Sequence, residues 1–189
     1  MAHLNVDFHS YYLGMDSPLT VLLPEKRGRK PEAAPDKKYP VLYLLHGHAD
    51  DNTAWIRKSD LELLVRDHDV IVVMPSAHRS FYTNGKYGHL YFDYITKELP
   101  IVVSNFFPAS TRREDTFIGG LSMGGYGALK AALSCPEQYA GAAAMSAANS
   151  PFEAMKAAGT MFSVSDFMDN VYRILARRRR SSIRYVTSC

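Results

Sequence analysis

A serine set between two glycines, in the string Gly-Leu-Ser-Met-Gly, is the feature that most constrains the fold of this chain. The string ends an apolar, strand-like run at 116–121 and begins a helix-like run at 123–134 that is rich in Ala and Leu. This order predicts a sharp turn from a strand into a helix, in which the serine is held at strained dihedral angles. Side chains two residues before and two residues after that serine would clash, which explains Gly120 and Gly124. We therefore expect Ser122 to project from the turn as a nucleophile.

The rest of the chain alternates between short apolar runs and amphipathic runs. Strands are predicted at 18–24, 40–46, 70–74, 116–121 and 140–146, and helices at 55–68, 91–107 (with a kink or restart at Pro100) and 123–134. Because strands and helices alternate, neighbouring strands are expected to be parallel and joined by right-handed crossovers. The sequence therefore predicts an α/β fold, a doubly wound and mostly parallel sheet with helices on both faces.

Length and composition fit one globular domain, with 189 residues of which 47% are hydrophobic and 22% charged. No apolar run approaches the ~20 residues that a membrane span needs, so no membrane partner is expected. The N-terminus lacks the basic and then apolar pattern of a secretory signal. The two cysteines, Cys135 and Cys189, do not make a disulfide framework, so a cytoplasmic location is expected.

The net charge of +3 arises at one end of the chain. Residues 1–172 alone sum to −3, and the balance comes from six arginines at 173, 177–180 and 184. A surface that binds nucleic acid needs basic side chains spread over a folded face, so nucleic acid is not expected as a partner. The pattern divides the chain into a domain at 1–172 and a basic, irregular tail at 173–189.

The sequence His46-Gly47-His48 stands at the carboxyl end of the strand predicted at 40–46. In hydrolases with a serine turn of this kind, one oxyanion donor is the amide after the nucleophile, and the second comes from a loop in this position. We expect the backbone N–H groups of His48 and Met123 to be these donors, with the positive end of a helix dipole behind Met123. The His46 ring is expected to brace the loop rather than to take a proton.

A glycine-rich turn after a strand can instead hold a phosphate group. The string GGLSMGGYG, however, lacks the Gly-Lys-Ser/Thr of a P-loop and the G-x-G-x-x-G of a dinucleotide site. Two predicted central strands also precede it, whereas a dinucleotide turn opens the first unit of strand and helix. A nucleotide site is therefore not expected.

Several stretches of the sequence share a family likeness: NVDFHS, LGMDSPLTVLLP, LYLLHGHADDNTAW, VVMPSAHRSFYTN, YFDYITKELP, FIGGLSMGGYGALKAAL and AAAMSAA. Together they resemble the esterase D family of α/β-hydrolases, and within it the tributyrin-esterase-like carboxylesterases. The resemblance implies hydrolysis of short-chain acyl esters or thioesters, thus of a small-molecule ester substrate, by a Ser-His-Asp triad with no cofactor and no metal. It also implies that Ser122 is the nucleophile and that His48 and Met123 provide the oxyanion donors.

The same resemblance implies that two aromatic residues lie near the acyl or leaving-group pocket. These are Trp55 and, in the loop at 80–82, Tyr82. Trp55 fits equally well as a core residue on one face of a helix.

In a triad of this kind the acid and then the histidine follow the serine along the chain. Neither residue can be identified after Ser122. All seven histidines precede Ser122, and the later acids Asp166 and Asp169 fit the first turn of a helix better than a triad position. We therefore expect a truncated domain that lacks its last strands and helices, ends in a frameshifted or alternatively spliced tail, and has weak or no activity. An arginine-rich tail that binds a partner is the alternative. His78 is the one histidine that could replace the missing base from a loop at the same edge of the sheet.

Other functions stay open at this point. The runner-up is an S-formylglutathione hydrolase, and a non-catalytic protein that binds ligands on the same scaffold is the alternative from another class. Feruloyl and acetylxylan esterases share the fold, but they usually act outside the cell and no export signal is visible. A sheet edge and an apolar face left open by missing strands favour association, so a homo-oligomer also stays open.

Overall fold

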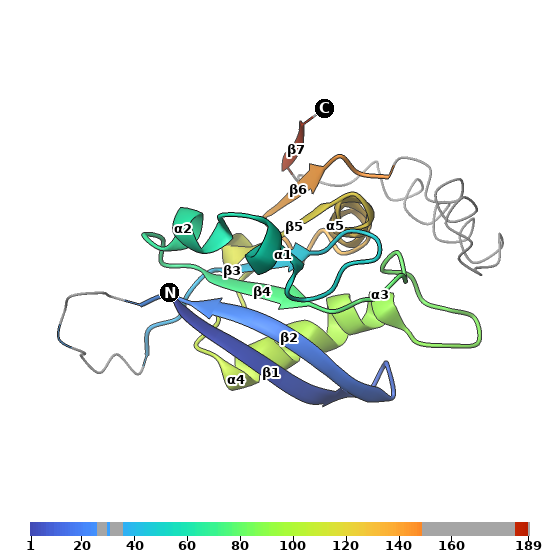
Figure 1. Ribbon diagram of the computed structural model, residues 1–189, viewed down its shortest axis with the longest axis horizontal. Helices are drawn as coiled ribbons and strands as arrows, with labels where there is room; N and C mark the ends of the chain where they lie inside the picture. Colours follow the sequence, from blue (N-terminus) through green and yellow to red (C-terminus); the bar gives the residue numbers. More distant parts are fainter. Residues whose placement is uncertain (26–29, 31–35, 149–183, 189) are drawn as a thin grey trace.

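The computed structural model describes residues 1–25, 30, 36–148 and the backbone of 184–188. Its strands are β1 (Ala2–Ser10), β2 (Met15–Leu23), β3 (Val41–Leu45), β4 (Ile71–Pro75), β5 (Thr116–Leu121), β6 (Gly141–Met145) and β7 (Arg184–Ser188). Its helices are α1 (Ala54–Lys58), α2 (Leu61–Val65), α3 (Tyr91–Asp93), the π turn η1 (Tyr94–Glu98), α4 (Leu99–Phe106), the 3₁₀ turn η2 (Arg113–Asp115) and α5 (Met123–Ser134). None of these helices is both long enough and apolar enough to cross a membrane. Figure 1 shows the sheet with helices on either side of it.

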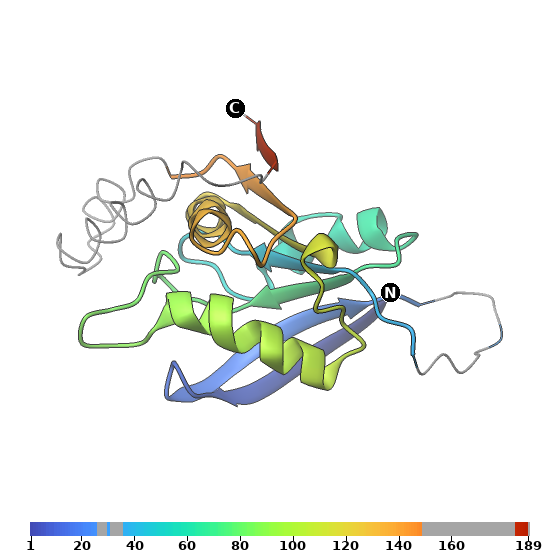
Figure 2. The ribbon, with the colours of Figure 1, turned by 180° about the vertical axis from the view of Figure 1, so that it is seen from behind.

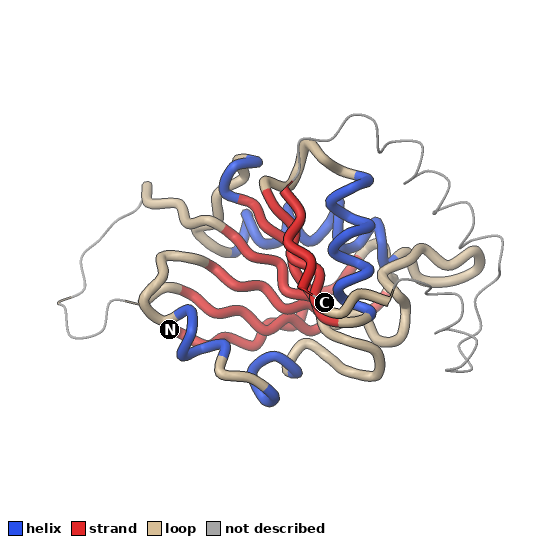
Figure 3. The backbone as a smooth tube through the Cα atoms, turned by 90° about the horizontal axis from the view of Figure 1, so that it is seen from above, coloured by secondary structure: helices blue, strands red, loops and turns tan. Residues whose placement is uncertain are grey.

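The sheet is mostly parallel, and its strands lie in the order β1-β2-β4-β3-β5-β6-β7. Figure 3 shows the strands side by side, with helices around them. The five strands from β4 to β7 in this order are parallel neighbours. The hairpin of β1 and β2 is antiparallel, and β2 also pairs antiparallel with β4. The α/β architecture predicted from alternating strands and helices is confirmed, with an antiparallel hairpin added at one edge.

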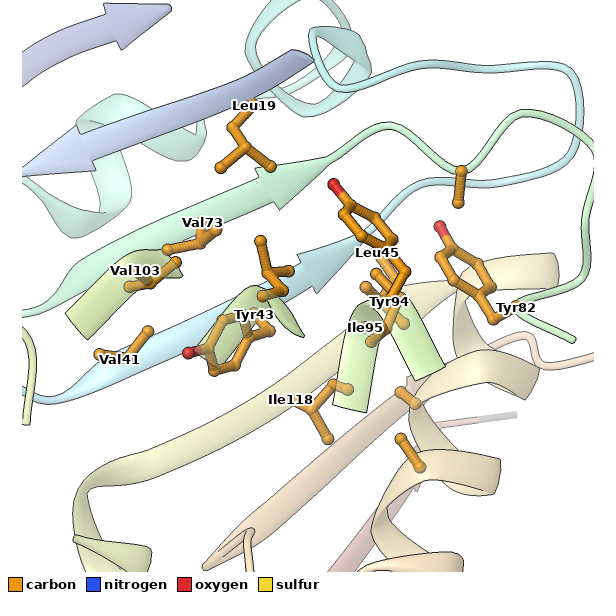
Figure 4. Packing of buried hydrophobic residues seen from close by; sticks show 14 of the residues in the cluster. Leu19, Val41, Tyr43, Leu45, Val73, Tyr82, Tyr94, Ile95, Val103 and Ile118 are labelled. Carbon is orange, nitrogen blue, oxygen red and sulfur yellow. The ribbon is translucent and has the colours of Figure 1, made fainter. Parts of the chain in front are cut away.

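Alternate side chains of β3 enter two different cores. Tyr43 and Leu45 lie in the larger core, which also contains residues of α4 and α5, and Figure 4 shows them with Val103 of α4. Leu44 lies in the smaller core, which contains Leu61 of α2. Helices therefore cover both faces, with α4 and α5 on one face and α1 and α2 on the other (Figures 1 and 2).

The connections between strands fix where a ligand can bind. After β3 the chain passes to α1 on one face of the sheet, and after β5 it passes to α5 on the opposite face. β3 and β5 are adjacent and parallel, so the two outgoing loops separate at the carboxyl ends of these strands. Such a topological switch point is where open α/β sheets bind ligands.

The helix predicted at 55–68 is in fact two short helices, α1 and α2. The chain leaves helical geometry at Ser59 (φ −148°, ψ 168°), whose hydroxyl donates to the Trp55 carbonyl oxygen at 2.5 Å. Asp60 then precedes α2 as its N-cap residue. The Ser59 hydroxyl thus occupies the carbonyl oxygen four residues earlier, and such a bond competes with the helical ladder at the point where α1 ends.

The helical run predicted at 91–107 is confirmed, and it contains a π turn just before Pro100. The N–H of Leu99 bonds to the carbonyl oxygen of Tyr94, five residues earlier. Pro100 has no N–H with which to continue the ladder, so the change of hydrogen-bond register falls at the residue before it.

The tail at 173–189, expected to be irregular, contains a strand. β7 pairs parallel with β6 along its whole length. Its residues Tyr185, Val186 and Thr187 have high β propensity, which explains a strand in a segment otherwise rich in arginine. Residues 149–183, which include the end of the expected domain, lie outside the described residues.

Candidate active site

Ser122 stands at the turn between β5 and α5. Its backbone has φ 56° and ψ −114°, a conformation that residues other than glycine rarely adopt. Its N–H donates to the carbonyl oxygen of Met145, in β6, at 2.9 Å. Its carbonyl oxygen accepts hydrogen bonds from the N–H groups of Tyr126 at 3.0 Å and Ala148 at 3.3 Å. These three bonds hold the serine in its strained conformation.

Glycine at positions 120 and 124 is a steric requirement of this turn. A Cβ at Gly120 would lie 2.8 Å from the Gly124 Cα and closer still to the Gly124 carbonyl group. A Cβ at Gly124 would lie 2.7 Å from the His46 carbonyl oxygen and closer still to that of Leu45, at the end of β3. Side-chain carbons do not approach other atoms so closely, so only glycines let β3, β5 and α5 meet at the serine.

The N-terminus of α5 points its amides toward the serine. The first hydrogen bond of the helix runs from Tyr126 N–H to the Ser122 carbonyl oxygen, so the N–H of Met123 has no partner within the helix. The amides and dipole of this twelve-residue helix favour negative charge at that end. The Met123 amide is therefore the candidate oxyanion donor on this side of Ser122.

The loop after β3 lies beside the serine. A Cβ at Gly47 would be 3.9 Å from the Ser122 Cβ, although the two residues are far apart in the sequence. His48 follows directly, so its amide is the candidate donor on the second side. The His48 ring is engaged elsewhere, because its Nε2 accepts a hydrogen bond from Nε of Arg79 at 3.1 Å. Partial burial and the Arg79 cation lower the pKa of His48, which favours the neutral ring.

The His46 ring braces this loop from inside. Its Nε2 accepts a hydrogen bond from the Ala77 N–H at 2.9 Å, and its Nδ1 lies 2.7 Å from the Gly47 carbonyl oxygen. Because Nε2 is an acceptor, the proton of the neutral ring is on Nδ1, which donates to Gly47. Burial lowers the pKa of His46 and so favours this neutral form. The bracing role predicted for the His46 ring is confirmed.

The loop after β4 is locked onto the loop after β3. The hydroxyl of Tyr82 donates to the His46 carbonyl oxygen at 2.9 Å, and the ring centroids of Phe81 and His48 are 5.6 Å apart. His78, Phe81 and Tyr82 have φ of 48°, 50° and 51°. Such strained residues cluster at functional sites and persist only where their surroundings hold them.

The two aromatic residues predicted for the pocket both make structural contacts. Tyr82 is 1% exposed, so it supports the loop at His46 from inside the fold rather than opening onto solvent. Trp55 is half-buried against the smaller core, and its indole N–H donates to the Leu45 carbonyl oxygen at 3.1 Å. Trp55 thus fits a core position and still lies at the end of β3, next to the site.

Lys130, on α5, is a residue that the sequence patterns did not indicate. It is 2% exposed, and its Nζ donates to the Tyr82 carbonyl oxygen at 3.2 Å and to the Thr83 Oγ1 at 2.8 Å. The sequence held one signal for it, a lysine among small apolar residues in GALKAAL. Because this helix has almost no polar face, its one lysine had to be buried or to point at a polar partner.

No side chain among residues 1–25, 30 and 36–148 forms a hydrogen bond with the Ser122 hydroxyl. His78, the predicted replacement base, is exposed, and its ring lies edge-on to Tyr91 with centroids 6.3 Å apart. Asp166 and Asp169 lie outside the described residues. The described part of the site therefore contains a candidate nucleophile and two candidate oxyanion donors, with no base in contact with the serine.

A mostly parallel α/β sheet, a serine on a strained turn from strand to helix, and a loop from the neighbouring strand beside that serine define the α/β-hydrolase class. The sequence profile of the "Putative esterase" family matches residues 10–187. The chain therefore belongs to this esterase family, and its resemblance to α/β-hydrolase esterases is confirmed.

Individual relatives show the same likeness. An acetyl esterase of Caldicellulosiruptor saccharolyticus is 34% identical over 158 residues, which cover 78% of this chain and 57% of that protein. The S-formylglutathione hydrolase FrmB of Staphylococcus aureus superimposes with a TM-score of 0.77 at 31% identity, over 98% of this chain and 78% of FrmB. FphF, a fluorophosphonate-binding serine hydrolase of the same bacterium, gives 0.73 at 27% identity, over 98% of this chain and 89% of FphF. The chain thus spans little more than half the length of the acetyl esterase.

Proposed function

We propose that this protein hydrolyses carboxylic esters with short acyl groups, using Ser122 as the nucleophile. The observation that supports the proposal is the position of the Gly47 backbone beside Ser122, because His48 follows Gly47 and Met123 follows Ser122 in the chain. The similarity to an acetyl esterase supports a short acyl group. The small number of cysteines supports the proposal of a cytoplasmic location.

In the proposed reaction, Oγ of Ser122 attacks the ester carbonyl carbon and its proton passes to a base. The N–H groups of His48 and Met123 bind the negative oxygen of the tetrahedral intermediate. The alcohol then leaves with a proton, and water releases the acid from the acyl-enzyme. A serine without a base is a weak nucleophile, and no described residue acts as one on Ser122. We therefore expect slow turnover from the 189-residue chain, sustained by the oxyanion donors.

The test is hydrolysis of p-nitrophenyl acetate and butyrate by the full chain, with labelling by a fluorophosphonate probe alongside. Turnover and labelling are both expected to disappear in Ser122→Ala. A matched control is Ser104→Ala on α4, which removes a hydroxyl that bonds to the Ile101 carbonyl oxygen of its own helix. Equal turnover in the wild type and in Ser122→Ala would contradict the proposal.

A thioester substrate is the second candidate, because the structure matches an S-formylglutathione hydrolase at 31% identity. Comparing kcat/KM for p-nitrophenyl butyrate and for S-formylglutathione separates the two substrates. A clear preference for the thioester would move the assignment to that activity, with the same nucleophile and oxyanion donors.

A non-catalytic binding protein is the candidate from another class, and the lack of a base on Ser122 among the described residues favours it. Fluorophosphonate labelling distinguishes it from an enzyme, because the probe reacts with an activated serine. Absence of labelling in a chain that is folded by circular dichroism would favour this alternative.

A further inference from the structure

Lys130 is a buried amine behind the candidate active site. It lies on α5, two helical turns after Ser122, and is 2% exposed. Its Nζ lies 4.7 Å from the ring centroid of Phe92, and no carboxylate among the described residues forms an ion pair with it. Asp93, which is nearby, pairs with Lys97 instead. Burying an amine without such a partner costs free energy, so a leucine or methionine would fill the same space at lower cost.

Within the part of the chain that the structure describes, the hydrogen bonds of the Lys130 side chain go to one short segment. Its Nζ donates to the carbonyl oxygen of Tyr82 and to the hydroxyl of Thr83. Tyr82 and the residue before it, Phe81, are consecutive residues with positive φ. Strained residues keep such conformations only where their neighbours hold them, and Lys130 supplies two of the holding bonds.

The same face of α5 also receives the ring of Tyr82. A Cβ at Gly127 would lie 2.6 Å from Cγ of that ring, so only glycine lets the ring lie flat on the helix. Gly127 and Lys130 are three residues apart and so share a helix face. Figure 4 shows Tyr82 beside α5. Tyr82 is therefore held by the helix at its ring and at its carbonyl group.

The far end of Tyr82 reaches the other half of the site. Its hydroxyl donates to the carbonyl oxygen of His46, the first residue of the loop that carries His48. We propose that Lys130 is a positioning residue that ties α5, which begins at Met123 directly after Ser122, to the oxyanion loop at His46–His48 through Tyr82. The two candidate donors then keep a fixed separation, because Met123 lies on the helix and His48 on the loop that Tyr82 connects. The inference rests on the proposed function.

Lys130 does not act as the missing base. It is eight residues from Ser122 along α5, which is about 12 Å at the rise of an α-helix. Burial lowers its pKa to about 7, against the opposing charge of Asp93. A neutral amine still has two N–H groups, so both hydrogen bonds to the Tyr82–Thr83 segment persist on either side of this pKa.

The first arm of the test is amide hydrogen exchange in Lys130→Met, which keeps the length of the side chain and removes its donors. Exchange is expected to rise about tenfold in the peptides that cover 76–85 and 46–50. Lys130→Gln, which retains N–H donors without a charge, should restore much of the protection and serves if the methionine variant is unstable. Lys97→Met is the matched control, since Lys97 is an exposed lysine on the neighbouring helix. Unchanged exchange in both Lys130 variants would overturn the proposal.

The second arm is a double-mutant cycle with Tyr82→Phe, read by kcat and KM for p-nitrophenyl butyrate and by the rate of fluorophosphonate labelling. Each single variant should lower kcat and the labelling rate about tenfold with little change in KM, because the donors act on charge in the transition state. The double variant should lose no more than either single variant, because both act through the same tie. Additive losses of about a hundredfold would overturn the proposal.

The failure of the proposed function is a separate outcome. If the wild type neither turns over esters nor is labelled, the esterase assignment fails. The exchange arm then still decides whether Lys130 holds the two loops together.

Discussion

The Tyr82 hydroxyl donates a hydrogen bond of 2.9 Å to the carbonyl oxygen of His46 and so joins the loop after β4 to the loop after β3. Tyr82 is 1% exposed, and burial raises the pKa of its hydroxyl well above the ordinary value, so it remains a donor at every working pH. The carbonyl that it contacts belongs to the same loop as the candidate donor His48. A single buried phenol therefore connects the core to the edge of the site.

Tyr82→Phe is expected to lower the free energy of unfolding by about 1 kcal/mol, because it leaves the His46 carbonyl oxygen short of a partner. Urea unfolding followed by tryptophan fluorescence measures the change. Tyr139→Phe is the matched control, because the buried Tyr139 hydroxyl has no hydrogen-bond partner among the described residues. That control should be neutral or stabilising. Equal destabilisation by the two changes would contradict a specific role for the Tyr82 hydroxyl.

Gly120→Ala is expected to destabilise the protein by about 3 kcal/mol and to remove fluorophosphonate labelling, because the new methyl group would overlap Gly124. Gly119→Ala provides a control in the preceding position of the same strand. A Cβ there would lie no closer than 3.4 Å to its neighbours, so a change within about 1 kcal/mol is expected. Thermal melts and labelling of both variants check the contrast, and a tolerated Gly120→Ala would show that the turn can relax.

Stability should fall in mild acid because of His46. Burial lowers its pKa below the ordinary 6.5, so near this pH the unfolded chain binds a proton that the folded chain does not. The free energy of unfolding therefore decreases as the pH falls below about 6.5, until the folded pKa is passed. His46→Gln should flatten this part of the curve, while His3→Gln, an exposed change on β1, should leave it as in the wild type. Parallel curves for the wild type and His46→Gln would argue against the buried neutral ring.

Lys130 should give a second rise of stability with pH, in the alkaline range. Its pKa is lowered to about 7 in the folded chain and returns to 10.5 on unfolding, so between these values the unfolded chain binds more protons. The free energy of unfolding should therefore rise from about pH 7 until the pH reaches the unfolded value of 10.5. Lys130→Met lacks this rise, and urea titrations at several pH values compare the two slopes. A wild-type curve that is flat over this range would show that Lys130 is charged in the folded protein.

The turn at Ser122 could be predicted because its steric requirements are local in the sequence. Gly120, Ser122 and Gly124 are close in sequence, and a sharp turn between strand and helix imposes their spacing directly. The loop at His46–His48 could be predicted because it follows a recognisable apolar strand. Both predictions needed only the residue types and the strand order, so they were accessible before any contact was known.

The supporting contacts could not be predicted in the same way. Tyr82 was expected to line a pocket, yet its ring lies against Gly127 and its hydroxyl meets a backbone carbonyl group. Lys130 looked like an ordinary polar residue of a helix. Which side of α5 is buried depends on the loop after β4, and that loop has strained residues at 78, 81 and 82 that no local pattern indicates.

From the three backbone hydrogen bonds of Ser122 we also expect a particular order of events during folding. One of them comes from β6 and another from Ala148, so the turn closes only after the segment that follows α5 has docked. The loop with Gly47 is contributed from far back in the chain, and contacts of such long range form late. A half-folded molecule can therefore contain every helix and still have an ordinary, unreactive serine. Reaction with a fluorophosphonate probe would then measure the fraction of fully folded molecules. The helical signal in circular dichroism would include partly folded molecules as well.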